Sequence, residues 1–215
     1  MLDPADHKQL QKRLLAWFDE HQRVLPWRKN KTPYRIWVSE IMLQQTQVAT
    51  VIPYFERFIV ELPTVQALAD ADEQKVLRLW QGLGYYRRAR NLRAAAKMIV
   101  KDFDSEVPAD VGTLLQLPGV GRYTAGAIAS IAHGTSAPIV DGNVARVFAR
   151  VFHLEQAIDS PPVQKQLWSL AEALVPSRSP GDFNQALMEL GALVCTPKSP
   201  SCPACPLRKQ CEANA

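Results

Sequence analysis

Apolar residues recur at helical spacing along almost the whole chain, and no stretch alternates between apolar and polar residues as a half-buried strand would. Residues 7–21 show the pattern clearly, because their leucines and aromatic residues give one apolar face. Ser39 is predicted to cap a helix that begins at Glu40, and Asn143 to cap a later helix. Pro53 is expected in the first turn of another. The sequence therefore predicts an all-α protein.

Length and composition narrow the class of protein. A chain of 215 residues can form one large domain or two lobes. Its content of 47% hydrophobic and 21% charged residues is ordinary for a soluble globular protein. No apolar run approaches the roughly 20 residues that span a bilayer, and charges between Asp3 and Lys8 interrupt any stretch resembling a signal peptide. We therefore expect a cytoplasmic monomer without a membrane partner.

Positive charge is concentrated in one segment. The net charge of +4 is only mildly basic, but residues 82–101 contain six arginines and lysines and no acidic residue. Such a segment forms either a solvated helix face or a contact with the phosphates of a nucleic acid. Because it follows a Gly-Leu-Gly-Tyr-Tyr turn, the sequence favours phosphate contact.

The four cysteines of the chain all lie in its last 21 residues, with the spacing C-x6-C-x2-C-x5-C. Disulfides are not expected in a chain without a secretory signal. Four thiolates this close together in sequence suit either a zinc ion or a 4Fe–4S cluster, and the spacing alone favours neither. The predicted metal ligands are Cys195, Cys202, Cys205 and Cys211.

The string Leu-Pro-Gly-Val-Gly at 117–121 is predicted to join two short helices. Its glycines allow a tight turn and let backbone amides approach a ligand. Because the next helix begins here, its unpaired N–H groups and the positive end of its dipole point the same way. A backbone site of this kind binds phosphate without reading the base sequence. The string looks like the helix–hairpin–helix element of DNA-repair proteins.

The hairpin string, an aspartate about twenty residues later and the cysteine tail together resemble the endonuclease III/MutY superfamily. Within it, the chain resembles MutY-type adenine glycosylases over nearly its full length. The matching strings are Leu25-Pro26-Trp27-Arg28, the segment from Trp37 to Gln47, Gly82-Leu83-Gly84-Tyr85-Tyr86, Val140-Asp141-Gly142-Asn143-Val144 and Met188-Glu189-Leu190-Gly191-Ala192.

The resemblance implies a two-lobed helix–hairpin–helix glycosylase fold with DNA bound across the cleft. One lobe, a six-helix barrel, would span about 30–135 and include the hairpin element at 111–133. The other would combine 1–29 with 136–215 and carry the cluster loop at 195–211. The resemblance also implies a 4Fe–4S cluster on the four cysteines. It further implies Na⁺ or K⁺ at the hairpin, held by the backbone carbonyls of Leu115, Leu117 and Val120.

The implied partner is double-stranded DNA with adenine opposite 8-oxoguanine or guanine, in a bacterial, nucleoid-associated setting. Bifunctional relatives have a lysine after the hairpin that forms a Schiff base with the sugar, whereas this chain has Tyr123 there and Ala145 at a second position where some relatives have lysine. Neither side chain can form an imine, so a monofunctional hydrolase is expected. Full-length MutY enzymes also carry a C-terminal domain resembling Nudix hydrolases, which this sequence does not contain.

Release of a purine needs an acid that improves the leaving base and a negative charge that stabilises the oxocarbenium sugar. The resemblance implies that Glu40 protonates adenine at N7 and that Asp141 is the ionised carboxylate facing the sugar. Since Glu40 is predicted at a helix N-terminus, where the dipole favours the anion, it would need burial to favour the neutral acid. Tyr123 and Asn143 are expected to orient Asp141 and the attacking water, with Glu189 in the same polar network.

The target nucleotide must leave the stacked duplex before its glycosidic bond can be reached. The resemblance implies that Gln45 and Tyr85 act as wedges at the lesion. The other predicted DNA contacts are Leu83, Arg88, Gly119, Val120, Gly121 and Arg122. The adenine pocket would be lined by Arg23, Leu25, Trp27 and Arg28, with core packing as the alternative for Leu25 and Trp27.

Three other functions compete with adenine release. The first two are an endonuclease III-like lyase acting on oxidised pyrimidines and a thymine–guanine mismatch glycosylase. The third is a non-catalytic DNA-binding module that carries a cluster. Tyr123 disfavours the lyase, and the pair formed by Glu40 and Asp141 disfavours a pure binding module, which needs neither carboxylate.

Overall fold

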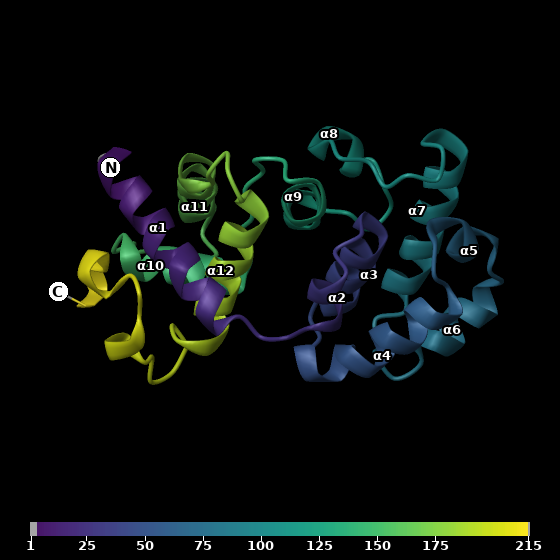
Figure 1. Cartoon of the computed structure of the whole chain (residues 1–215), viewed down its shortest axis with the longest axis horizontal. Coiled ribbons are helices and arrows are strands. Elements are labelled where there is room, and N and C mark those ends of the chain that lie inside the picture. The colour runs from purple at the N-terminus through teal and green to yellow at the C-terminus, as the bar shows by residue number, and fades with distance from the viewer. Residues whose placement is uncertain (1–3, 215) are drawn as a thin grey trace. The chain divides into compact units, whose positions relative to one another are not determined.

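The computed structural model of the chain describes residues 4–214, and every regular element within that range is a helix (Figure 1). The all-α prediction is confirmed. None of the helices in these residues combines the length and the apolar character needed to cross a membrane. The chain divides into two compact units, which we call the central unit (Val24–His133) and the terminal unit (the chain up to Arg23 together with Gly134 onward).

The central unit packs its helices around a core of large aromatic side chains. Trp37, Phe55, Phe58 and Trp80 are almost completely buried, and the rings of Phe58 and Trp80 meet edge to face at 6.0 Å. Helix α3 packs on α4 and α9, and α7 packs on α5 and α6. The helices of this unit are α2 (Pro26–Lys29), α3 (Pro33–Leu43), α4 (Val48–Glu61), α5 (Val65–Asp70), α6 (Glu73–Trp80), α7 (Arg87–Asp102), α8 (Val111–Leu114) and α9 (Arg122–His133).

The terminal unit brings together segments that are far apart in sequence. Helix α1 packs on α12, and α12 in turn packs on α10, so the beginning and the end of the chain share one core. Leu10, Leu14 and Phe18 of α1 are buried in it, as are Phe148 and Phe183. The helices of this unit are α1 (Pro4–His21), α10 (Gly142–Val151), α11 (Pro161–Leu174), α12 (Pro180–Leu193) and the short 3-10 turns η1 (Cys202–Ala204), η2 (Arg208–Gln210) and η3 (Glu212–Asn214).

The predicted start of the helix that carries Glu40 is wrong. Helix α3 begins at Pro33, and Thr32 is its N-cap, because the Thr32 hydroxyl accepts the Arg35 backbone N–H at 3.3 Å. Ser39 lies inside the helix, where its hydroxyl donates to the Ile36 carbonyl at 2.8 Å. Glu40 is therefore near the C-terminal end of α3, not at its N-terminus.

Two other predicted starts are also wrong. Helix α4 begins at Val48, so Pro53 lies inside it and not in its first turn. The N-cap of α10 is Asp141, whose carboxylate accepts the Val144 backbone N–H at 2.7 Å, whereas Asn143 is the second residue of the helix. This second correction matters for function, because it places the carboxylate of Asp141 at the positive end of a helix dipole.

Candidate active site

Glu40 is a buried acid in the central unit. Only 6% of the residue is exposed, and its Oε2 accepts a hydrogen bond from the hydroxyl of Tyr123 at 2.9 Å. Tyr123 comes from the first turn of α9, which packs against α3. Burial disfavours a carboxylate anion, and the negative end of the α3 dipole disfavours it further. Both effects favour the protonated form, which is the form a general acid needs.

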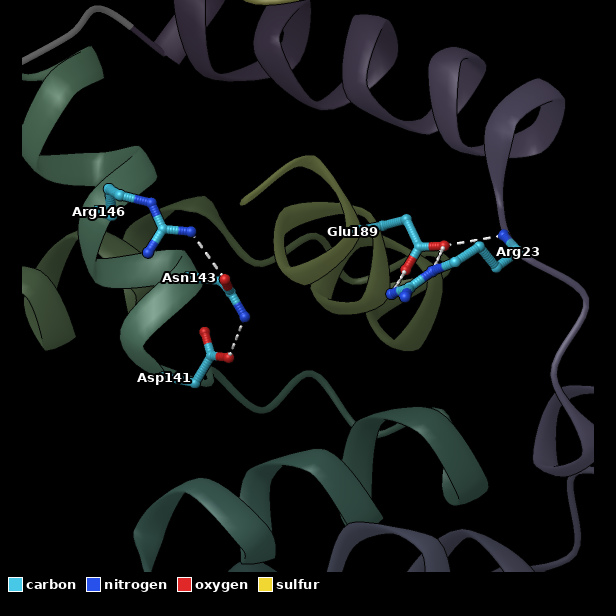
Figure 2. A network of polar contacts seen from close by, with 5 residues as sticks. All are labelled: Arg23, Asp141, Asn143, Arg146 and Glu189. Carbon is cyan, nitrogen blue, oxygen red and sulfur yellow. Dashed lines mark hydrogen bonds and ion pairs between the residues drawn. The ribbon is translucent and has the colours of Figure 1, made fainter. Parts of the chain in front are cut away.

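Asp141 lies in the opposite kind of environment, in the terminal unit. Its two oxygens are bound separately, since Oδ1 accepts the Val144 N–H at 2.7 Å and Oδ2 accepts the Asn143 side-chain amide at 3.0 Å (Figure 2). Asp141 is only partly buried and sits at the N-terminus of α10. Both oxygens of Asp141 are therefore held by donors at the start of this helix. The expected contact between Asn143 and Asp141 is present.

Glu189 is bound by Arg23 through three hydrogen bonds (Figure 2). The backbone N–H and the Nε of Arg23 reach Oε1 at 2.8 and 2.9 Å, and its Nη2 reaches Oε2 at 2.8 Å. The Glu189 side chain is 1% exposed and that of Arg23 is 36% exposed, so the carboxylate is buried while part of the arginine reaches solvent. The hydrogen bond to Glu189 raises the pKa of Arg23, which keeps the guanidinium charged. This pairing was not foreseen from the sequence.

Arg146 joins the polar group around Asp141 to the cysteine segment. Its Nη2 donates to Asn143 Oδ1 and to the Gly191 carbonyl, both at 2.8 Å, and its Nε donates to the Cys195 carbonyl at 2.8 Å. Gly191 permits this close approach of α10 and α12, because a Cβ there would lie 2.6 Å from the Cβ of Asn143. The orientation of Asn143 is therefore fixed from two sides.

The four cysteines line one cavity of about 170 Å³ in the terminal unit. A cavity of about 150 Å³ is large enough for benzene, so this one accommodates a group larger than a single ion. Four thiols around one cavity are a donor set that suits either zinc or an iron–sulfur cluster.

Burial disfavours ionisation of two thiols of this cavity. Burial, followed by the neighbouring thiols, raises the pKa of Cys205 to about 11, and burial also raises the pKa of Cys211. Arg150 supplies compensating charge, because its Nη1 donates to Cys195 Sγ at 3.3 Å and to the Thr196 carbonyl at 2.8 Å. A metal group that binds here must displace the thiol protons, and a neighbouring guanidinium stabilises the resulting thiolates.

The hairpin between α8 and α9 has the backbone that its glycines predict. Gly119 has φ +80°, and a Cβ there would lie 2.8 Å from the Cβ of Asn91, so a larger residue does not fit. Leu117 and Val120 are buried and anchor the turn, with the Val120 N–H bound to the Leu117 carbonyl at 3.1 Å. Gly121 and Arg122 are exposed at the start of α9. The hairpin thus presents its backbone while its side chains anchor it.

Gln45 and Tyr85, the two predicted wedges, share an uncommon backbone conformation. Both are non-glycine residues with positive φ, 55° for Gln45 and 48° for Tyr85. Both are exposed, and Tyr85 has 63% of its surface accessible. Residues in the left-handed region cost free energy and tend to occur at functional sites. The backbone conformation of both residues is therefore one that the surrounding structure must hold in place.

The structure does not support DNA contacts by Arg88 and Leu83. Arg88 is 9% exposed, and its guanidinium is occupied by backbone carbonyls inside the central unit. Leu83 is also buried. The basic segment is less available for contact with phosphates than its sequence suggests. Arg90 pairs with Glu73, and Arg93 donates to the Ala71 carbonyl at 2.7 Å. These three arginines mainly stabilise the fold around α7.

The residues predicted to line a base pocket differ in exposure. Leu25 and Trp27 are each 5% exposed, and Trp27 meets Phe55 edge to face at 5.3 Å, so both belong to the core of the central unit. Arg28 is partly exposed in the central unit, and Arg23 is bound to Glu189 in the terminal unit.

Comparison with known proteins agrees with this geometry. The model of the family described as "HhH-GPD superfamily base excision DNA repair protein" matches residues 38–173, which is more than half of the chain. The chain belongs to the HhH-GPD superfamily. The match includes both Glu40 and Asp141, while the cysteine segment lies beyond it. The predicted family is therefore confirmed.

Individual relatives of this HhH-GPD protein place it near adenine glycosylases. It is 50% identical over 221 residues to the adenine DNA glycosylase of Rattus norvegicus and 51% identical over 210 residues to that of Homo sapiens. These alignments cover 99% and 94% of the chain but only 43% and 38% of the two relatives. The chain thus spans less than half the length of these relatives.

Solved structures confirm the predicted fold. A thermostable thymine-DNA glycosylase superposes with a TM-score of 0.88 and 30% identity, covering 99% of each chain. A trapped endonuclease III–DNA covalent intermediate superposes with a TM-score of 0.81 and 23% identity, covering 100% of this chain and 98% of that one. The second likeness concerns the fold alone.

Sequence reasoning missed Arg146 and Arg150 of this HhH-GPD protein. The two lie four residues apart on α10, and residues with that spacing share one helix face. That spacing could have suggested a common partner. Nothing local in the sequence, however, indicates that both would reach a segment more than forty residues later.

Proposed function

We propose that this protein is a monofunctional DNA glycosylase that hydrolyses the N-glycosidic bond of adenine mispaired with 8-oxoguanine or guanine. The observation that carries the proposal is the contrast between Glu40 and Asp141. Glu40 is buried near a helix C-terminus, and Asp141 caps a helix N-terminus with two donated hydrogen bonds. Acid-assisted glycoside cleavage requires two carboxyl groups in different environments, one to donate a proton and one to stabilise the developing cation.

In the proposed reaction, Glu40 gives its proton to N7 of adenine as the bond from the base to the sugar breaks. Asp141 stabilises the positive charge that develops on the sugar. Water then adds to the anomeric carbon and releases its proton to solvent, and Glu40 takes up a proton from solvent before the next turnover. Adenine leaves with the proton from Glu40, so the net reaction is hydrolysis. The hydroxyl of Tyr123 holds Glu40, and the amide of Asn143 holds Asp141. Tyr123 stands where lyase relatives have lysine and Ala145 where some other relatives have it, and neither carries an amine, which supports hydrolysis over lyase chemistry.

The adenine assignment is supported most directly by the relatives. Identity to adenine glycosylases is about half, whereas identity to the thymine-DNA glycosylase of known structure is 30%. The proposed substrate contacts are Gln45 and Tyr85 at the lesion, the hairpin backbone on phosphate, and Arg23 and Arg28 toward the base. The carbonyls of Leu115, Leu117 and Val120 would hold a Na⁺ or K⁺ ion that helps to neutralise a phosphate.

Adenine release is tested with duplexes that carry a single mispair. We expect free adenine, and abasic sites revealed by alkali, from duplexes with adenine opposite 8-oxoguanine or guanine. Duplexes with thymine opposite guanine, or with an oxidised pyrimidine, should remain intact in the same assay. Release of thymine or of the oxidised pyrimidine instead of adenine would reject the proposal in favour of the corresponding rival glycosylase.

We also propose that Cys195, Cys202, Cys205 and Cys211 hold a 4Fe–4S cluster. All four line one cavity, and the guanidinium of Arg150 lies against Cys195 Sγ. Bound there, the cluster would cross-link the turns that follow α12. The proton on each thiol must leave when iron binds, so assembly is expected to be easier at higher pH, in keeping with the raised pKa of Cys205.

Loss of one ligand should abolish the cluster. We expect the purified protein to be coloured, with a charge-transfer absorbance band in the violet that Cys202→Ser removes together with bound iron. Ser201→Ala, an exposed neighbour, is the matched control and should keep the band. Iron and zinc are measured in both variants by elemental analysis. A colourless wild-type protein that contains one zinc ion would contradict the proposed cofactor.

A further inference from the structure

The guanidinium of Arg88 joins the two loops that carry Gln45 and Tyr85. On one side, Nη1 donates to the carbonyls of Ile41 and Met42, at 3.1 and 2.8 Å, and to that of Gln44. These carbonyls lie at the C-terminal end of α3, where no further helical N–H groups are left to donate to them. On the other side, Nη2 donates to three acceptors: Thr46 Oγ1 at 3.1 Å, the Leu83 carbonyl at 3.2 Å and the Gly84 carbonyl at 3.3 Å.

The contacts of Arg88 surround the two exposed residues closely. Gln45 lies between Gln44 and Thr46, and both of these neighbours accept hydrogen bonds from the guanidinium. Tyr85 follows Gly84, another acceptor, and its ring lies 5.4 Å from the guanidinium carbon. Both loops belong to the central unit. One planar group thus bonds the backbone beside Gln45 and the backbone beside Tyr85.

The backbone of both loops needs such support. Gln45 and Tyr85 have φ of 55° and 48°, a conformation that non-glycine residues keep only where the surrounding structure holds them. Their exposed side chains contribute no core packing that could do so. An arginine is suited to the task, because its planar fork presents several donors in fixed directions, whereas lysine has three donors on a single atom. A lysine at 88 cannot reach the acceptors of both loops at once.

We propose that Arg88 is a positioning residue that sets the distance and orientation between Gln45 and Tyr85, so that both enter the duplex together as one rigid wedge. The proposal rests on the proposed function, since it assumes that these two side chains insert at the lesion. This role also explains why Arg88, on the basic helix α7, is buried against carbonyls and does not face solvent. Arg88 acts on the reaction through the two residues it positions.

Arg88→Lys tests the proposal on two substrates. On a duplex with adenine opposite 8-oxoguanine, we expect single-turnover release to slow by about 10²-fold, the cost of small misplacements of reacting groups. On a duplex with a bulged adenine, which is already partly unstacked, the loss should be several-fold smaller. A general loss of stability or of chemistry would slow both substrates equally, so equal losses would overturn the proposal.

Arg93→Lys is the matched control, because Arg93 lies on the same helix and its Nε donates to the Ala71 carbonyl, away from both loops. It should release adenine from both substrates at wild-type rates, and a loss as large as that of Arg88→Lys would count against a wedge-specific role. If Arg88→Lys does not fold, Thr46→Val removes one acceptor of Arg88 beside Gln45 and should show the same substrate dependence in milder form. Equal behaviour of Thr46→Val on both substrates would overturn the proposal.

A fluorescence measurement separates this proposal from the proposed function. With 2-aminopurine beside the mispair, wild-type protein should raise the fluorescence as the side chains insert, and Arg88→Lys should raise it less at saturating protein. This signal needs no chemistry, so it persists even if the protein releases a base other than adenine. Equal fluorescence changes for the two proteins would overturn the role of Arg88 and leave the proposed function standing.

Discussion

Replacement of Glu40 by glutamine should slow single-turnover adenine release by about 10²- to 10⁴-fold, the range lost when a general acid is removed. Glutamine keeps the shape of the side chain and can still accept the Tyr123 hydroxyl at its amide oxygen, but it has no proton to give to N7. The change should leave DNA affinity and melting temperature nearly unchanged. Glutamine has nearly the same size as glutamic acid and carries no charge, so it fits the buried position of Glu40. Rates are measured with enzyme in excess over an adenine–8-oxoguanine duplex.

Glu56→Gln provides the matched control, because Glu56 is exposed on α4 in the same central unit. It should release adenine at the wild-type rate. Near-normal release by Glu40→Gln would show that another group supplies the proton. A large loss of DNA affinity, with normal release once DNA is bound, would assign Glu40 to binding and not to chemistry.

The helix positions of the two carboxyl groups give each a different environment through the fold itself. Glu40 lies in the last turn of α3 and is buried against α9, so the dipole and the low polarity act together. Asp141 lies before the first turn of α10, where the Val144 N–H and the Asn143 amide each bind one of its oxygens. The conflict expected from the sequence, between dipole and burial at Glu40, does not exist in the structure.

The fold class could be read from the sequence, because it depends on local patterns, whereas Glu40 and Asp141 follow from the resemblance to a known family and stay predictions. Helical periodicity predicts the all-α fold, and the spacing of the cysteines predicts a metal site. The first residue of a helix is harder to predict where two nearby residues both suit the N-cap position. Thr32-Pro33 and Ser39 both suit an N-terminus, and the structure uses Thr32 because proline fixes the first turn. The same ambiguity between Asp141 and Asn143 is resolved by the carboxylate that accepts the Val144 N–H.

Contacts between distant segments could not be predicted. Arg23 and Glu189 are 166 positions apart, and Arg146 reaches a carbonyl 49 residues later. No local pattern links such pairs, since their approach depends on the packing of α12 against α1 and α10. For the same reason Arg88 was assigned to phosphate from its basic surroundings. Its actual partners are carbonyls that only the packed structure brings within reach.

Asp141→Asn should slow adenine release by about 10²- to 10³-fold, comparable to the loss of one preorganised electrostatic group. Asparagine caps helices as well as aspartate does, so the contact with the Val144 N–H can be kept while the negative charge facing the developing cation is lost. The lost dipole interaction is worth about 0.3–1 kcal/mol, which lowers the melting temperature of a protein of this size by at most about 4 °C. Activity should therefore fall far more than stability.

Asp72→Asn separates capping from catalysis, because Asp72 is the exposed N-cap of α6 and accepts the Gln74 N–H at 3.2 Å. It makes the same chemical change at the same helix position in another part of the fold. Melting temperatures of the two variants should shift by similar small amounts, whereas only Asp141→Asn should lose adenine release. If Asp141→Asn released adenine at the wild-type rate, the charge of Asp141 would have no part in stabilising the sugar. Asp141 would then serve only as a helix cap beside Asn143 and Arg146.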